Sequence, residues 1–206
     1  MSDKVSSLPR RGQTWHGGAV DSDAYGNSVD KEGFVQEFAD EEAVTGMGAQ
    51  TKASSRTTTC ILVRNTAAVA LTPGRVVTWQ ADYRGKRVDG YGTATAAAVA
   101  GVVDDKLPSG GVAIGDLFWL MVKGPALVKT SLAGDAENVI ADGDNLVALT
   151  AATSGATTAG RINGQVLTGA TQPLADQIQN RIGVAMSAKT TANTNADVLV
   201  DLLIDE

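Results

Sequence analysis

The chain has very little cysteine, since Cys60 is the only one among 206 residues. A single thiol excludes an intrachain disulfide and a cysteine-based zinc cluster, which is typical of a protein assembled in a reducing cytoplasm. Cys60 leads directly into the apolar run Ile61-Leu62-Val63. We therefore expect its side chain to be a small buried hydrophobe and not a reactive thiol.

Histidine is equally scarce, since His16 is the only one. It lies beside two glycines in a segment without a regular apolar pattern, so a serine or cysteine triad would have no positioned base. The glycine-rich stretches lack the Lys-Ser/Thr of a phosphate-binding loop, and no dinucleotide-binding fingerprint is present. The sequence thus predicts a protein that is not an enzyme and that holds no cofactor.

Long apolar runs and an excess of positive charge are also missing. No hydrophobic stretch reaches membrane-spanning length, and the first residues lack the apolar core of a signal peptide. Lysine and arginine number 17 against 23 acids, which gives a net charge of -6. Because no basic face is evident, we expect neither direct nucleic-acid binding nor a membrane partner.

The first 56 residues differ in texture from the rest of the chain. They are polar and glycine-rich and show no sustained hydrophobic period, so we interpret residues 1–56 as an extended N-terminal arm. At most one short helix is expected in it, at about residues 31–44, where Phe34, Val35 and Phe38 would share a face. A large apolar group in a polar segment gains most by docking on a partner. We therefore predict Trp15, Phe34 and Phe38 as partner-binding residues.

Residues 57–206 show short apolar runs divided by turn residues, which predicts a β-rich body. Aromatic residues make up only 4% of the chain and Gly, Ala and Thr are plentiful, which suits strands and turns better than a helical bundle. The strongest strand signal is Asp116 to Lys123, entered through Gly115 and left through Gly124-Pro125. The predicted fold class is mainly β, with a β-barrel or β-sandwich body.

One part of the arm partly matches a calcium-binding loop. Asp21, Asp23, Gly26 and Glu32 occupy positions 1, 3, 6 and 12 of that pattern. Tyr25, however, stands where position 5 requires an oxygen ligand, and no helix precedes the loop. We therefore expect no metal site and interpret the segment as an acidic, glycine-punctuated part of the arm.

Two further groupings have both a functional and a structural interpretation. Asp104-Asp105 and Asp142-Gly143-Asp144 resemble the paired carboxylates of a glycosidase, but both lie at predicted turns, where aspartate bonds its own backbone. Trp79, Trp119 and Tyr91 would form a sugar-stacking platform if they were exposed. Two of the three lie inside apolar runs, so we expect them in the core.

Two stretches of the body carry a recognisable pattern. The first runs from Ala100-Gly101-Val102-Val103 through a glycine-rich turn to the aromatic strand that ends in Val122-Lys123-Gly124-Pro125-Ala126. The second is Ile182-Gly183-Val184-Ala185-Met186-Ser187-Ala188, followed after a Thr/Ala/Asn spacer by Val198-Leu199-Val200-Asp201-Leu202-Leu203. Together they resemble the small β-rich decoration, or cement, proteins of tailed-bacteriophage capsids.

The resemblance implies a decoration protein that binds the outer surface of a phage head and cross-links neighbouring capsid subunits. Its implied partners are the major capsid protein and further copies of the chain, with a trimer favoured. Its implied location is the capsid surface of the virion, after assembly in the host cytoplasm. The long arm departs from the shorter members of this family, so the resemblance does not determine whether the arm binds a sister protomer or the shell. The residues alone indicate only a β-rich interaction module. The alternative to a decoration protein is therefore a glycan- or receptor-binding module of a phage tail or bacterial surface.

Overall fold

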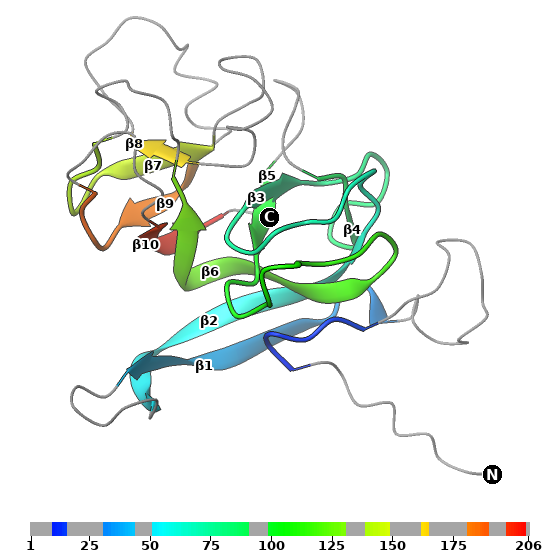
Figure 1. Ribbon diagram of the computed structural model, residues 1–206, viewed down its shortest axis with the longest axis horizontal. Helices are drawn as coiled ribbons and strands as arrows, with labels where there is room; N and C mark the ends of the chain where they lie inside the picture. Colours follow the sequence, from blue (N-terminus) through cyan, green and yellow to red (C-terminus); the bar gives the residue numbers. More distant parts are fainter. Residues whose placement is uncertain are drawn as a thin grey trace, which may run out of the picture.

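The computed structural model describes residues 10–15, 31–43, 51–90, 99–130, 139–148, 162–164, 181–189 and 197–204. The regular structure in these residues consists of strands (Figure 1), so the predicted mainly β fold is confirmed. The strands are β1 (Val35–Ala43), β2 (Thr51–Asn65), β3 (Val76–Thr78), β4 (Arg87–Val88), β5 (Val99–Val103), β6 (Leu117–Lys129), β7 (Asn145–Ala148), β8 (Ile162–Gly164), β9 (Arg181–Ala185) and β10 (Asp197–Leu203).

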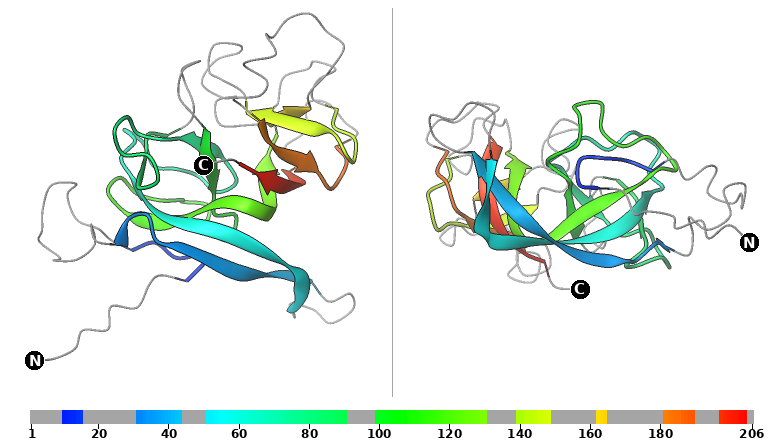
Figure 2. Two further views of the ribbon diagram at one scale, coloured as in Figure 1. Left: turned by 180° about the vertical axis from the view of Figure 1, so that it is seen from behind. Right: turned by 90° about the horizontal axis from the view of Figure 1, so that it is seen from below.

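The strands join into one open sheet whose main path is β1-β2-β6-β10-β9-β7-β8. Away from this path, β5 pairs with β6 and β3, and β4 pairs with the end of β2. The β2–β4 pair is parallel, whereas the other strand pairs of the described residues are antiparallel. Figure 2 shows β1 and β2 as a long two-stranded ribbon along one side of the body.

The long strand β6 bends in its middle and so belongs to two parts of the sheet. Its first half pairs with β2 and its second half with β10. The bend lies at Gly124, whose φ of 88° is a left-handed conformation that glycine adopts without strain. A Cβ at Gly124 would also lie 2.1 Å from the carbonyl oxygen of Thr57. The Gly124-Pro125 pair that marked the end of the predicted strand is therefore a corner within a longer strand.

The second half of β2 and the first half of β6 are buried on both faces, because they separate two hydrophobic clusters. Cys60 and Leu62 of β2 contribute to one cluster, and Ile61 and Val63 to the other. The β6 side chains alternate in the same way, with Leu117, Trp119 and Met121 in the first cluster and Phe118, Leu120 and Val122 in the second. Burial on both faces explains why the sequences of these strand segments are continuous apolar runs.

The helix expected at residues 31–44 is wrong over the described residues, because Val35–Ala43 form the strand β1. Side chains of β1 alternate with a period of two: Gln36, Phe38 and Asp40 are partly buried, while Val35, Glu37, Ala39 and Glu41 are exposed. Pairing with β2 supplies backbone hydrogen bonds that a local sequence pattern does not reveal. Tertiary pairing therefore outweighs the helical spacing of Phe34, Val35 and Phe38.

The described part of the arm lies against the body. The boundary predicted after residue 56 falls inside β2, which begins at Thr51. Upstream of β1, residues 10–15 lie beside the start of β6, where Trp15 and Leu117 form an antiparallel bridge. The described arm residues are consequently part of the same sheet and core as the body.

Candidate functional site

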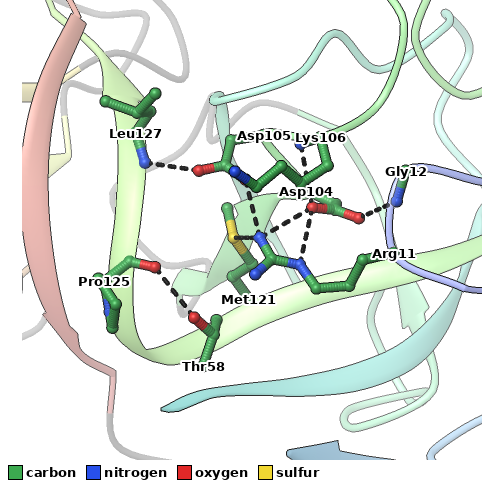
Figure 3. A network of polar contacts seen from close by, with 9 residues as sticks. All are labelled: Arg11, Gly12, Thr58, Asp104, Asp105, Lys106, Met121, Pro125 and Leu127. Carbon is green, nitrogen blue, oxygen red and sulfur yellow. Dashed lines mark hydrogen bonds and ion pairs between the residues drawn. The ribbon is translucent and has the colours of Figure 1, made fainter. Parts of the chain in front are cut away.

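The first candidate site is the contact between residues 10–15 of the arm and the turn after β5. Arg11 Nη2 lies 3.0 Å from Asp104 Oδ1 and 2.8 Å from Asp105 Oδ1, so one guanidinium bridges both aspartates (Figure 3). The Gly12 amide donates to Asp104 Oδ2 at 2.7 Å. The Arg11 Nη2 also contacts the sulfur of Met121 at 3.1 Å. We call this group of Arg11, Gly12, Asp104 and Asp105 the Arg11 clasp.

Backbone geometry on both sides of the clasp fixes its position. Gly12 has a φ of 78°, and a Cβ there would lie 2.8 Å from the Lys106 carbonyl oxygen, so only glycine fits without displacement. Three residues later, the Trp15 amide donates to the Leu117 carbonyl, and the Leu117 amide donates to the Trp15 carbonyl, both at 2.8 Å. These contacts hold the described arm segment on the body at two successive points.

Both oxygens of each clasp carboxylate accept hydrogen bonds from the protein. Asp104 also accepts from the Lys106 amide at 3.1 Å, and Asp105 Oδ2 accepts from the Leu127 amide at 2.9 Å. Asp104 is fully buried, and the side chains of Arg11 and Asp105 are nearly so. The two carboxylates therefore neutralise the Arg11 guanidinium and also accept hydrogen bonds from three backbone amides.

The clasp contains more acidic than basic groups, with one cation between two acids. Burial raises the pKa of the Asp105 carboxyl above its ordinary value, although the Leu127 amide and Arg11 act in the opposite direction. Burial alone would lower the pKa of Arg11, but Asp104 and Asp105 outweigh it and the pKa is raised. Arg11 therefore stays charged, while Asp105 takes up a proton more readily than a free aspartate does.

The second candidate site is a buried ion cluster at the end of β2. Glu32 Oε1 accepts from Arg64 Nε, and Glu32 Oε2 accepts from Arg87 Nε at 3.0 Å. The side chains of Glu32 and Arg64 are each only 1% exposed. Arg64 also donates from Nη1 to the Gly115 carbonyl at 2.8 Å, which links this group to the loop before β6. We call Glu32, Arg64 and Arg87 the Glu32 cluster.

The three predicted partner-binding residues lie in different environments. Trp15 is half-buried against the first hydrophobic cluster, and Lys31 Nζ lies 4.5 Å from the centre of its ring. Phe38 also packs on this cluster, edge-on to Trp119 with ring centres 5.1 Å apart. Phe34, in contrast, is 49% exposed. Of the three, Phe34 has the most side-chain surface available to a partner in this structure.

Structural interpretations of several other residues are confirmed. Cys60 is fully buried, and burial raises the pKa of its thiol to about 12. Trp79 and Trp119 are core residues. The aspartates form turns as expected, since Asp104 accepts from the amide two residues on and Asp144 accepts from the Ala141 amide at 2.7 Å.

Three sequence predictions concern residues that the structure describes only partly or not at all. His16 and Tyr91 lie outside the described residues. The calcium-loop pattern lies outside them as well, apart from its last member, Glu32, whose two oxygens bind Arg64 and Arg87. In the described part of the chain, no three or more His, Cys, Asp or Glu side chains are grouped so as to hold a metal ion.

Sequence reasoning missed the Arg11 clasp and the Glu32 cluster. Arg11 lies in a polar, glycine-rich segment whose pattern predicts no contact with the body, and Glu32 is part of the calcium-loop pattern. One signal was available for Arg64, because a charge that directly continues the apolar run Cys60-Ile61-Leu62-Val63 requires a buried counter-ion. Which acid supplies it, 32 residues away, depends on the fold.

The described residues contain no helix that would span a bilayer. Neither a scan against models of known protein families nor a search of curated proteins finds a match for this chain.

Proposed function

We propose that this protein is a capsid decoration protein, which binds the outer surface of a phage head and cross-links neighbouring capsid subunits. The observation that carries the proposal is that the two stretches resembling such proteins form adjacent strands. β10 pairs with the second half of β6 along all seven of its residues, from Asp197 with Lys129 to Leu203 with Lys123. β9 pairs with β10, and β5 pairs with β6. The likeness therefore covers one continuous unit, β5-β6-β10-β9, and not two unrelated fragments.

The roles of the buried charges support a structural and non-enzymatic function. Asp104 and Asp105, one of the two acid pairs that resemble those of a glycosidase, bind Arg11 and backbone amides. Glu32 binds two arginines in the core. These groups contribute to holding the N-terminal arm on the body, which is what a protein under mechanical load on a particle surface requires.

The major capsid protein and further copies of this chain are the proposed partners, on the surface of the virion. The test is sedimentation of the purified full-length protein with empty heads of its own phage. We expect saturable co-sedimentation at a fixed ratio of decoration protein to capsid protein, and heads that open at a higher temperature when decorated. Failure to co-sediment, or binding that never saturates, would overturn the proposal.

The structure determines which deletion tests the role of the arm. Removing residues 1–56 takes away Arg11, Glu32, β1 and the start of β2, and leaves like charges buried in the body. Loss of head binding after that deletion would report unfolding. Deleting residues 1–9 keeps every contact described above, and we expect it to weaken head binding while the thermal midpoint of the free protein stays unchanged. Unaltered head binding would show that residues 1–9 do not contact the head.

A further inference from the structure

Among the described residues, most of the exposed large hydrophobic side chains lie at one end of the molecule. The structure describes eight such side chains, and five lie on segments that meet at the end of β2, on the right in Figure 1. Each of the five is between 41% and 55% exposed. They are Phe34, Val35, Val69, Tyr83 and Ile114. We call the surface formed by residues 31–35, 66–71, 79–87 and 112–116 the loop end.

Hydrogen bonds to the last two residues of β2 show that these four segments are neighbours. Arg64 binds Glu32 of the first segment and the Gly115 carbonyl of the last. The Asn65 side-chain amide donates to the carbonyls of Val69, Val112 and Ala113, at 3.2, 3.0 and 3.2 Å. The third segment joins through Arg87, which binds Glu32 and lies with its guanidinium carbon 4.2 Å from the centre of the Tyr83 ring.

This network makes the loop end a preorganised surface. Its segments are fixed by charged and amide groups in the interior, where such bonds are stronger than at the surface. The apolar side chains above them are therefore presented without the ordering cost that mobile loops would incur on binding. Exposed apolar side chains on neighbouring segments that are held in place are typical of a protein–protein contact.

The exposed charges at the loop end indicate the occupant. Asp82, Arg84, Lys86 and Asp89 are exposed on and beside the third segment, two of each sign. The chain as a whole carries a net charge of -6. Two copies carry the same net charge and so repel each other overall, and a segment with balanced charges lowers that repulsion where the copies meet. Because the segment presents both signs, an acid of one copy can pair with a base of another copy across such a contact.

We infer that the loop end is the surface through which copies of this chain associate around a symmetry axis. The apolar side chains form the centre of the contact, and the mixed charges of residues 82–89 form its rim. This inference deepens the proposed function, of which self-association of the body is a part. It is tested on the free protein, so its failure is distinguishable from failure to bind a phage head.

The first test is sedimentation velocity of the full-length chain over a range of concentrations. Wild-type protein is expected to be an oligomer, and the double variant Phe34→Ser, Ile114→Asn to dissociate at least about tenfold more readily. Both positions are exposed, so the fold should survive, which the thermal midpoint checks. Leu127→Asn with Leu203→Asn is the matched control, because these side chains are equally exposed on β6 and β10. The control is expected to dissociate like the wild type within about twofold.

The second test uses cross-linking and depends on the buried state of Cys60. Its thiol, with a pKa of about 12, does not compete with an introduced exposed cysteine. Oxidation of Ile114→Cys is expected to give a covalent pair of chains, whereas Leu203→Cys stays monomeric under denaturing conditions. A monomeric wild type, an oligomer unaffected by the Phe34 and Ile114 changes, or equal cross-linking at both positions would each overturn the inference.

Discussion

The Arg11 clasp and the Glu32 cluster have opposite charges but the same arrangement, in which one charged residue lies between two residues of the opposite charge. In the clasp, one arginine of the arm lies between two aspartates of the body. In the cluster, one glutamate of the arm lies between two arginines of the body. In each case the body alone would bury two like charges, and the arm supplies the counter-charge. The arm is therefore an integral part of the fold, at least where the structure describes it.

The two sites differ in depth, which sets their expected energetic weight. The cluster contains an ion pair with both side chains only 1% exposed, Glu32 with Arg64, whereas each clasp pair includes the Arg11 side chain, which is 11% exposed. Loss of one partner from a fully buried pair leaves a charge without either water or a counter-ion. The comparison therefore predicts a larger loss of stability at the Glu32 cluster than at the clasp.

The largest effect is expected for Glu32→Gln. Glutamine keeps the volume but removes the charge, which leaves Arg64 and Arg87 uncompensated and lowers the free energy of unfolding by about 3–5 kcal/mol. Urea unfolding measures this difference, and adding Arg64→Met should recover part of it. Lys129→Gln is the control, because its ion pair with Asp197 is solvent-exposed and contributes at most about 1 kcal/mol. If Glu32→Gln lowered the free energy of unfolding no more than Lys129→Gln does, the predicted role of Glu32 as a buried counter-ion would be wrong.

A smaller effect is expected at the clasp for Arg11→Met. Methionine retains a similar chain length but removes the donors to Asp104 and Asp105, and the expected loss is roughly 1–3 kcal/mol. Asp104 keeps its bonds from the Gly12 and Lys106 amides, which limits the loss. Arg10→Met is the matched control, since Arg10 is the exposed neighbour, and a change within about 0.5 kcal/mol is expected. Equal losses of unfolding free energy for Arg11→Met and Arg10→Met would show that the contacts of Arg11 with Asp104 and Asp105 do not stabilise the fold.

The smallest effect is a pH dependence carried by Asp105. Its folded-state pKa is raised by burial above the ordinary value of 3.8, so the folded protein binds this proton more tightly than the unfolded chain does. The stabilisation from Asp105 is thus fully present below 3.8 and is lost as the pH rises through the raised folded value. Wild type should gain stability relative to Asp105→Asn as the pH falls from 7 toward 4. Urea unfolding of both proteins across that range checks this, and a constant or shrinking difference would refute it.

Much of the strand pattern was accessible from the sequence, but the edges of the sheet were not. The run before Gly124 predicted β6 because apolar residues bounded by glycine and proline have few other solutions. The segment from Val35 to Ala43 is a strand and not the expected helix, because its few apolar residues fit both periods and only pairing with β2 decides between them. The candidate sites were missed for a related reason, because ion pairs join residues 32 to 94 positions apart.

By itself, the sequence determined a mainly β protein with Cys60, Trp79 and Trp119 in its core, because apolar patterning and glycine placement are local properties. Only the tertiary structure decided that β5, β6, β10 and β9 are neighbours, and that Arg11 and Glu32 neutralise charges of the body. The tertiary structure also decided that Phe34 and Ile114 both lie at the loop end. The physical reason is that hydrogen bonds and ion pairs depend on distance in space, which the order of residues does not specify.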